Sequence, residues 1–131
     1  YVDSTLNQAR VQGYVNTLFG RKRFIPDMHS LPFVERQALE REAMNMPIQG
    51  ANADLIKIAM IRIQHALDEK RWMTRMILQV HDELVFEVAV EELERVKRLV
   101  KAMMEGVAEL DVPIKVEMKV GKNWYEAEPM D

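Results

Sequence analysis

Three ionisable side chains stand together at His81, Asp82 and Glu83, here called the acidic turn, between two apolar, β-branched runs, Met73–Val80 and Glu83–Val88. We expect the two runs to form a hairpin whose tight turn holds His81 and Asp82. An aspartate there can reach a hard cation such as Mg²⁺, which prefers oxygen ligands. A two-metal site for phosphoryl transfer needs at least two carboxylates from different elements, so the acidic turn offers one side of such a site. A solvated hairpin turn explains the same residues, because Asp is common in turns.

A second candidate is a row of polar residues at helical spacing. Arg41, Asn45 and Gln49 are four residues apart, so they line one face of a helix, here called the polar face. Arg and amide side chains form hydrogen bonds with base edges. The wet side of an ordinary amphipathic helix gives the same row, although amides stand where Lys or Glu is the commoner choice. A third candidate, the basic run Gly20–Arg23, could hold phosphates, yet short basic turns are common.

Composition limits the class of protein. The 131 residues include 18 basic and 21 acidic side chains, a net charge of -3, with 48% apolar residues, as in one globular domain. The absence of Cys excludes a disulfide scaffold, a thiol nucleophile and a cysteine zinc site. No run reaches the roughly 18–20 apolar residues of a membrane span, and we expect no membrane partner. The first residues lack the pattern of a secretory signal, so we expect none. They also lack an initiator Met, so we expect the natural chain to begin upstream.

Hydrophobic periodicity and turn residues predict an α+β fold, with helices packed on one face of an antiparallel sheet. We expect the long helix to be interrupted at Met46-Pro47, because proline removes a backbone donor. We expect the last strand to pair with the acidic-turn hairpin in one sheet. The predicted elements are a helix at 1–12 that stops at Gly13, a hairpin of 14–18 with 21–25, a helix at 33–67, the hairpin of 73–80 with 83–88, a helix at 91–110 and a strand at 113–120.

Four motifs follow one another along the chain: GYVxTLxGRxR from Gly13, ERxAxNxPIQGxxAD from Glu40, QVHDELVFE from Gln79, and Asn123-Trp124. Together they resemble the C-terminal part of the polymerase domain of family A DNA polymerases, the bacterial DNA polymerase I family. The resemblance covers nearly the whole chain. It implies a DNA-directed DNA polymerase that transfers nucleotides to a primer 3′-hydroxyl by two-metal catalysis.

The resemblance implies a role for each matched residue of the acidic turn. Asp82 matches a metal-binding, catalytic aspartate that helps to hold two Mg²⁺ ions. Glu83 matches its acidic neighbour, which has a supporting catalytic role, and His81 matches a residue that contacts the primer 3′ end.

The resemblance also implies contacts with DNA along the long helix. Arg41, Asn45 and Gln49 match residues that lie along the minor groove of primer–template, and Arg36 matches a residue bound to the template strand. Two departures are Glu35, where the family often has a basic residue, and Ala51-Asn52, which replaces the frequent Thr-Ala.

The implied fold is an antiparallel palm sheet packed by helices, with a flanking piece of the fingers. Residues 1–33 would be the fingers side, and residues 34–131 the palm segment. The family's other metal-binding aspartate, in an Asp-Tyr-Ser motif, and the fingers helix that grips dNTP do not occur here. The segment is therefore expected to be inactive alone. The implied partners are primer–template DNA, dNTP and the remaining palm, fingers and thumb, in the cytoplasm at the nucleoid.

Two other functions fit the residues taken alone. One is a non-catalytic α+β interaction module, in which the acidic turn has no chemical role. The other is a metal-dependent nuclease that uses His81, Asp82 and Glu83 with further carboxylates, which the sequence does not single out.

Overall fold

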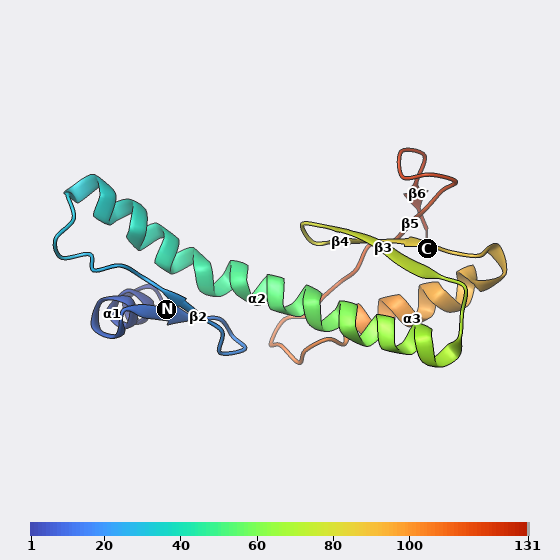
Figure 1. Ribbon diagram of the computed structural model, residues 1–131, viewed down its shortest axis with the longest axis horizontal. Coiled ribbons are helices and arrows are strands. Elements are labelled where there is room, and N and C mark those ends of the chain that lie inside the picture. The colour runs from blue at the N-terminus through green and yellow to red at the C-terminus, as the bar shows by residue number, and fades with distance from the viewer. Residues whose placement is uncertain (131) are drawn as a thin grey trace. The chain divides into compact units, whose positions relative to one another are not determined.

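The computed structural model describes residues 1–130, which form two compact units (Figure 1). The N-terminal unit is Tyr1–Asp54, and the C-terminal unit begins at Leu55. The predicted fingers–palm boundary after residue 33 is a different kind of division and stays a prediction. Among residues 1–130, no helix combines the length and the apolar character needed to cross a lipid bilayer.

The N-terminal unit packs a helix and a small hairpin against the first part of a long helix. Its elements are α1 (Val2–Gln12), β1 (Tyr14–Asn16), β2 (Lys22–Phe24) and the beginning of α2 (Phe33–Lys70). Gly13 ends α1 with φ 71, and its N–H donates to the Ala9 carbonyl at 3.0 Å. Such a left-handed cap favours glycine. The predicted helix end and hairpin are confirmed. The buried core residues are Ala9, Val15, Ile25, Met28 and Ala43.

The predicted interruption at Met46-Pro47 is wrong, because α2 continues through Pro47 to Lys70. Proline has no N–H to donate to the Ala43 carbonyl, so this turn lacks one helical hydrogen bond. Packing compensates: Ala43 is completely buried in the N-terminal core, and Met46 packs against the same core. Tertiary contacts therefore override the low helix propensity of this turn.

The C-terminal unit has a helical core against which a hairpin packs. Apolar side chains of α2 and α3 (Leu93–Glu105) form the core, and Met76, Leu84 and Phe86 of the hairpin pack on it. The hairpin strands are β3 (Arg75–Val80) and β4 (Glu83–Glu87), as predicted. A short 3₁₀ helix, η1 (Val90–Glu92), leads into α3. The helix ends earlier than the predicted residue 110, at Gly106, a residue that favours helix ends. The buried core residues are Ala59, Ile63, Leu67, Val96, Val100 and Val107.

The predicted last strand is only partly formed. Strand β5 covers Lys119–Val120 and pairs with β6 (Glu128–Pro129), not with the hairpin, so residues 1–130 contain three separate two-stranded sheets. The α+β class is confirmed, whereas the single sheet is wrong. The alternating apolar and charged residues at 113–118 reflect burial and not strand pairing, because Ile114 and Met118 pack against the core. The Val116 N–H donates to the Glu105 carboxylate at 3.1 Å. A side chain takes a donor that a sheet partner would otherwise use.

Candidate functional site

The acidic turn consists of the two-residue connection between β3 and β4 and the first residue of β4. Val80 pairs with Glu83, which leaves His81 and Asp82 as the turn. All three side chains of the acidic turn are exposed. His81 has φ 52, in the left-handed region that non-glycine residues rarely adopt. The Gln79 side-chain amide donates to the His81 carbonyl at 2.6 Å and so closes the turn from the strand before it. The strands thus present the Asp82 carboxylate to solvent at a fixed position along the hairpin.

A buried carboxylate fixes the chain where it enters β3. Glu92 is 3% exposed and accepts hydrogen bonds from the Met73 N–H (3.1 Å), the Thr74 N–H (3.0 Å) and the Thr74 hydroxyl (2.7 Å). Arg95 donates to the same carboxylate at 3.0 Å, and its guanidinium lies 4.9 Å from the centre of the Trp72 ring. The hydrogen bond from the Thr74 hydroxyl is the largest cause that lowers the pKa of Glu92. These bonds hold the base of the hairpin whose far end is the acidic turn.

Sequence reasoning missed Glu92, because a glutamate beside a charged helix looks like an ordinary surface residue. The available signal was its position at the start of α3, where backbone N–H groups of a neighbouring segment can reach a carboxylate. Nothing in the sequence showed that the segment would be 73–74.

The oxygen donors of the acidic turn suit a hard cation in chemical type but not in number. The Asp82 carboxylate is exposed, and Glu83 follows it on β4. Mg²⁺ is held by one or two carboxylates together with water or phosphate oxygens. Within residues 1–130, no group of three or more His, Asp or Glu side chains could hold a metal ion. Within the described residues, the acidic turn therefore supplies two neighbouring carboxylates, those of Asp82 and Glu83, which are too few for a complete Mg²⁺ site.

The polar face belongs to the N-terminal unit. Arg41, Asn45 and Gln49 all lie exposed on the continuous helix α2. Arg36 is half-buried, and its guanidinium lies 5.7 Å from the centre of the Phe33 ring. The acidic turn lies in the C-terminal unit, so the predicted site residues are divided between the two units.

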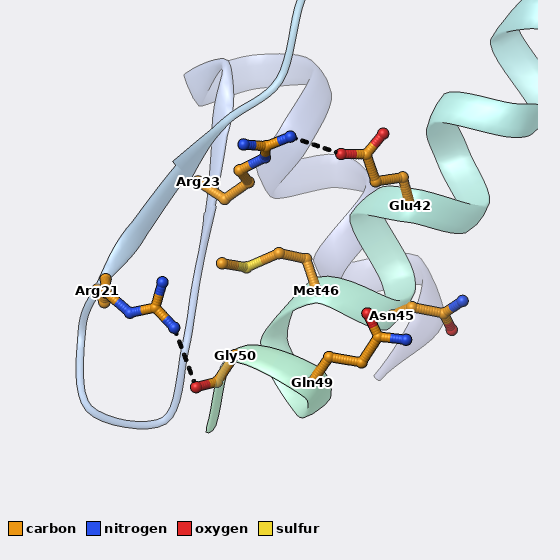
Figure 2. A pocket seen from close by; sticks show the side chains of 7 residues that line it. All are labelled: Arg21, Arg23, Glu42, Asn45, Met46, Gln49 and Gly50. Atoms are coloured by element: carbon orange, nitrogen blue, oxygen red, sulfur yellow. Dashed lines mark hydrogen bonds and ion pairs between the residues drawn. The ribbon is translucent and has the colours of Figure 1, made fainter. Parts of the chain in front are cut away.

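A pocket of about 510 Å³ brings part of the polar face together with the basic run. Figure 2 shows Met46 pointing from α2 toward the hairpin, between Arg21 and Arg23, while Asn45 points away from the hairpin. Arg36 and Arg41 do not line this pocket. The lining residues are Arg21, Arg23, Glu42, Asn45, Met46, Gln49 and Gly50.

The two arginines of the pocket are already paired. Arg23 donates to the Glu42 carboxylate at 2.9 Å, and Arg21 donates to the Asp54 carboxylate at 2.8 Å. The exposed amides of Asn45 and Gln49 supply the uncharged hydrogen-bonding groups of the pocket. An amide both donates and accepts, so these groups suit a polar, uncharged edge such as the minor groove of a base pair.

Comparison with known proteins places the chain in a family. The model for "DNA polymerase family A" matches residues 1–126. DNA polymerase I of Lactococcus lactis subsp. cremoris (strain MG1363) is 47% identical over 127 residues, and the thermostable DNA polymerase I of Thermus aquaticus is 48% identical over 127 residues. Each match covers 97% of this chain, but the chain spans only 14% and 15% of these two relatives, respectively.

A solved structure agrees in fold as well as in sequence. The POL domain of Pol1 from M. smegmatis, solved in complex with DNA primer-template and dNTP, superposes with a TM-score of 0.83 and 43% sequence identity. The superposition covers 88% of this chain and 20% of that one. Because the family model matches residues 1–126, nearly the whole of this sequence, the chain belongs to DNA polymerase family A.

Proposed function

We propose that this chain is the C-terminal segment of a DNA-directed DNA polymerase, an enzyme that adds nucleotides to a primer 3′-hydroxyl along a template. The observation that carries the proposal is the likeness to the M. smegmatis POL domain, with a TM-score of 0.83 and 43% identity over 88% of the chain. That protein was solved with DNA primer-template and dNTP, and we propose the same classes of partner here. The remaining palm, fingers and thumb would come from a longer chain, in the cytoplasm at the nucleoid.

Asp82 is proposed as the metal-binding catalytic residue, with Glu83 in a supporting role. The exposed position of Asp82 in a two-residue turn leaves its carboxylate oxygens accessible to a cation that other parts of the enzyme would also hold. When bound, Mg²⁺ would stabilise negative charge on the phosphoryl oxygens. His81, next to Asp82 in the same turn, is proposed to contact the primer 3′ end. The hairpin would set the spacing between these two side chains.

The polar face is proposed to lie along the minor groove of primer–template. Minor-groove acceptors are nearly the same for all base pairs, so Arg41, Asn45 and Gln49 would check the shape of the pair without reading its sequence. Arg36 is proposed to contact the template strand. Its guanidinium lies over the Phe33 ring, 5.7 Å from the ring centre.

We expect the 131-residue chain to be inactive alone, because its described residues hold only part of a metal ligand set. Function is therefore tested in a chimera, in which this chain replaces the matching 127-residue segment of the Lactococcus lactis DNA polymerase I. We expect the chimera to extend a primer in a template-dependent manner with Mg²⁺ and all four dNTPs. A chimera that folds and binds primer–template but does not extend it would contradict the proposal. Extension by the isolated chain would contradict its expected dependence on the missing parts.

The same assays separate the other two functions. An interaction module would leave the chimera without extension activity. A nuclease would shorten the labelled primer when Mg²⁺ is present and dNTPs are absent.

A further inference from the structure

Arg21 joins the turn of the β1–β2 hairpin to α2 directly after Gln49. Its Nε donates to Asp54 Oδ1 at 2.8 Å, and its Nη2 donates to the Gly50 carbonyl at 3.1 Å. Figure 2 shows the guanidinium reaching from the hairpin to this carbonyl, while the side chain of the preceding Gln49 points away from the hairpin. One planar side chain thus holds two groups on successive turns of the helix, which the fork of an arginine can do and a lysine cannot.

Thr17 completes the network from the other end of the same turn. Its hydroxyl donates to Asp54 Oδ2 at 2.7 Å and accepts from the Arg21 N–H at 3.1 Å. The turn is also closed by its backbone, because the Thr17 N–H donates to the Arg21 carbonyl at 2.9 Å. Thr17 is 5% exposed, so the network stands on a buried residue. Arg21 therefore acts on the helix from a fixed base.

The helical turn that receives these bonds contains the two residues of α2 with the lowest helix propensity, Pro47 and Gly50. Pro47 removes one helical hydrogen bond, and Gly50 is a poor helix former. Gly50 also allows the hairpin to come close, since a Cβ at this position would lie 2.5 Å from Thr17 Cγ2. The bonds from Arg21 thus support the part of α2 that its own sequence supports least. Gln49 lies between Pro47 and Gly50 in this turn.

We propose that Arg21 is a positioning residue, which fixes the helical turn around Gln49 and so sets the direction of the Gln49 amide toward the minor groove. The expected effect of Arg21 on primer extension rests on the proposed function. Its structural part, the support of residues 47–54 by Arg21, stands apart from that function. Arg21 itself needs no contact with DNA for this role.

The structural part is tested on the chain itself by hydrogen exchange. Arg21→Lys keeps the charge but loses the fork, so we expect the amides of residues 48–54 to exchange about tenfold faster, the effect of one or two lost hydrogen bonds. Arg98→Lys on α3 is the matched control, because among residues 1–130 Arg98 donates only to the Glu94 carbonyl of its own helix. Unchanged exchange at 48–54 in Arg21→Lys would overturn the proposal.

The functional part is tested in the chimera by a double-mutant cycle. We expect Arg21→Lys to slow extension about tenfold, and to add less than about twofold in a Gln49→Ala background. A primer that ends in 3-deazaguanine lacks the minor-groove N3 acceptor, so the unmodified chimera should extend it more slowly than a primer that ends in guanine. This difference in extension rate should shrink in Arg21→Lys and in Gln49→Ala. A residue with a merely structural role would instead multiply its effect with that of Gln49→Ala, and this result would overturn the proposal.

A second variant covers the case in which Arg21→Lys does not fold. Asp54→Asn removes the charged partner of Arg21, and we expect the same faster exchange and the same non-additivity with Gln49→Ala. If both variants behave like Arg98→Lys, Arg21 does not position Gln49. If the unmodified chimera does not extend a primer, the proposed function fails, while the exchange experiment still decides whether Arg21 supports the helix.

Discussion

At the scale of single residues, the Glu92 carboxylate links the base of the hairpin to α3 through four hydrogen bonds. These bonds stabilise the ionised form, so the pKa of Glu92 lies below its ordinary value of 4.5. A lowered pKa in the folded state adds stability that is complete above the ordinary pKa and is lost as the pH falls through the lowered pKa.

We therefore predict that Glu92→Gln lowers the melting temperature at neutral pH and weakens its dependence on pH below about 4.5, the ordinary pKa. The amide keeps one acceptor but cannot satisfy all the donors. Thermal melts from neutral to acid pH measure both effects, and Glu91→Gln, an exposed neighbour, is the control. If the melting temperature of Glu92→Gln falls with acid pH as steeply as that of the unmodified chain, another carboxylate causes the acid-dependent loss of stability.

At the scale of elements, the acidic-turn hairpin keeps His81 in a strained conformation. A left-handed φ of 52 costs a non-glycine residue about 1–2 kcal/mol. We predict that His81→Gly raises the free energy of unfolding by about 1 kcal/mol and weakens extension in the chimera, because the proposed primer contact is lost. Urea denaturation measures the first effect, and primer extension the second.

The matched control is His65→Gly in the C-terminal part of α2, where glycine costs helix stability, about 1 kcal/mol relative to alanine and less relative to histidine. The same substitution should thus raise the free energy of unfolding at position 81 and lower it at position 65. If His81→Gly destabilises the chain as His65→Gly does, the turn conformation is not a source of strain.

The turn of α2 at Pro47 makes a second prediction at this scale. Pro47→Ala restores a donor for the Ala43 carbonyl, so we predict an increase of about 1–3 kcal/mol in the free energy of unfolding. Urea denaturation measures it, with Ile48→Ala, an exposed neighbour, as a control expected to change stability by less than about 0.5 kcal/mol. A loss of stability in Pro47→Ala would mean that the proline ring contributes more by packing than it costs the helix.

These elements show what the sequence could predict. The acidic-turn hairpin and the end of α1 at Gly13 depend on local turn chemistry, so they were predicted correctly. The continuity of α2 through Pro47 and the missing sheet pairing of residues 113–118 depend on contacts with distant segments, which local patterns do not contain. For the same reason, the sequence suggested the polar face and the basic run separately, and only the fold shows Arg21 bonded to Gly50 in the turn that carries Gln49.

At the scale of the whole molecule, charge does not mark a DNA-binding surface. Residues 1–54 contain six basic and six acidic side chains, and the net charge of -3 comes from the remainder. Arg21 and Arg23 are paired with Asp54 and Glu42. In the proposed enzyme, this segment would contribute amides and one metal-binding carboxylate, and other parts would supply most of the positive charge that holds phosphates.

The most direct test of this account is Asp82→Asn in the chimera, measured for primer extension and for primer–template binding in the same preparation. We predict that extension falls by about a thousandfold, the effect of losing several kcal/mol of metal-assisted stabilisation, while binding changes by less than about twofold. Asp111→Asn, the same exchange at another exposed aspartate, should leave both unchanged. A near-normal extension rate in Asp82→Asn would contradict the assignment of this carboxylate to the metal site.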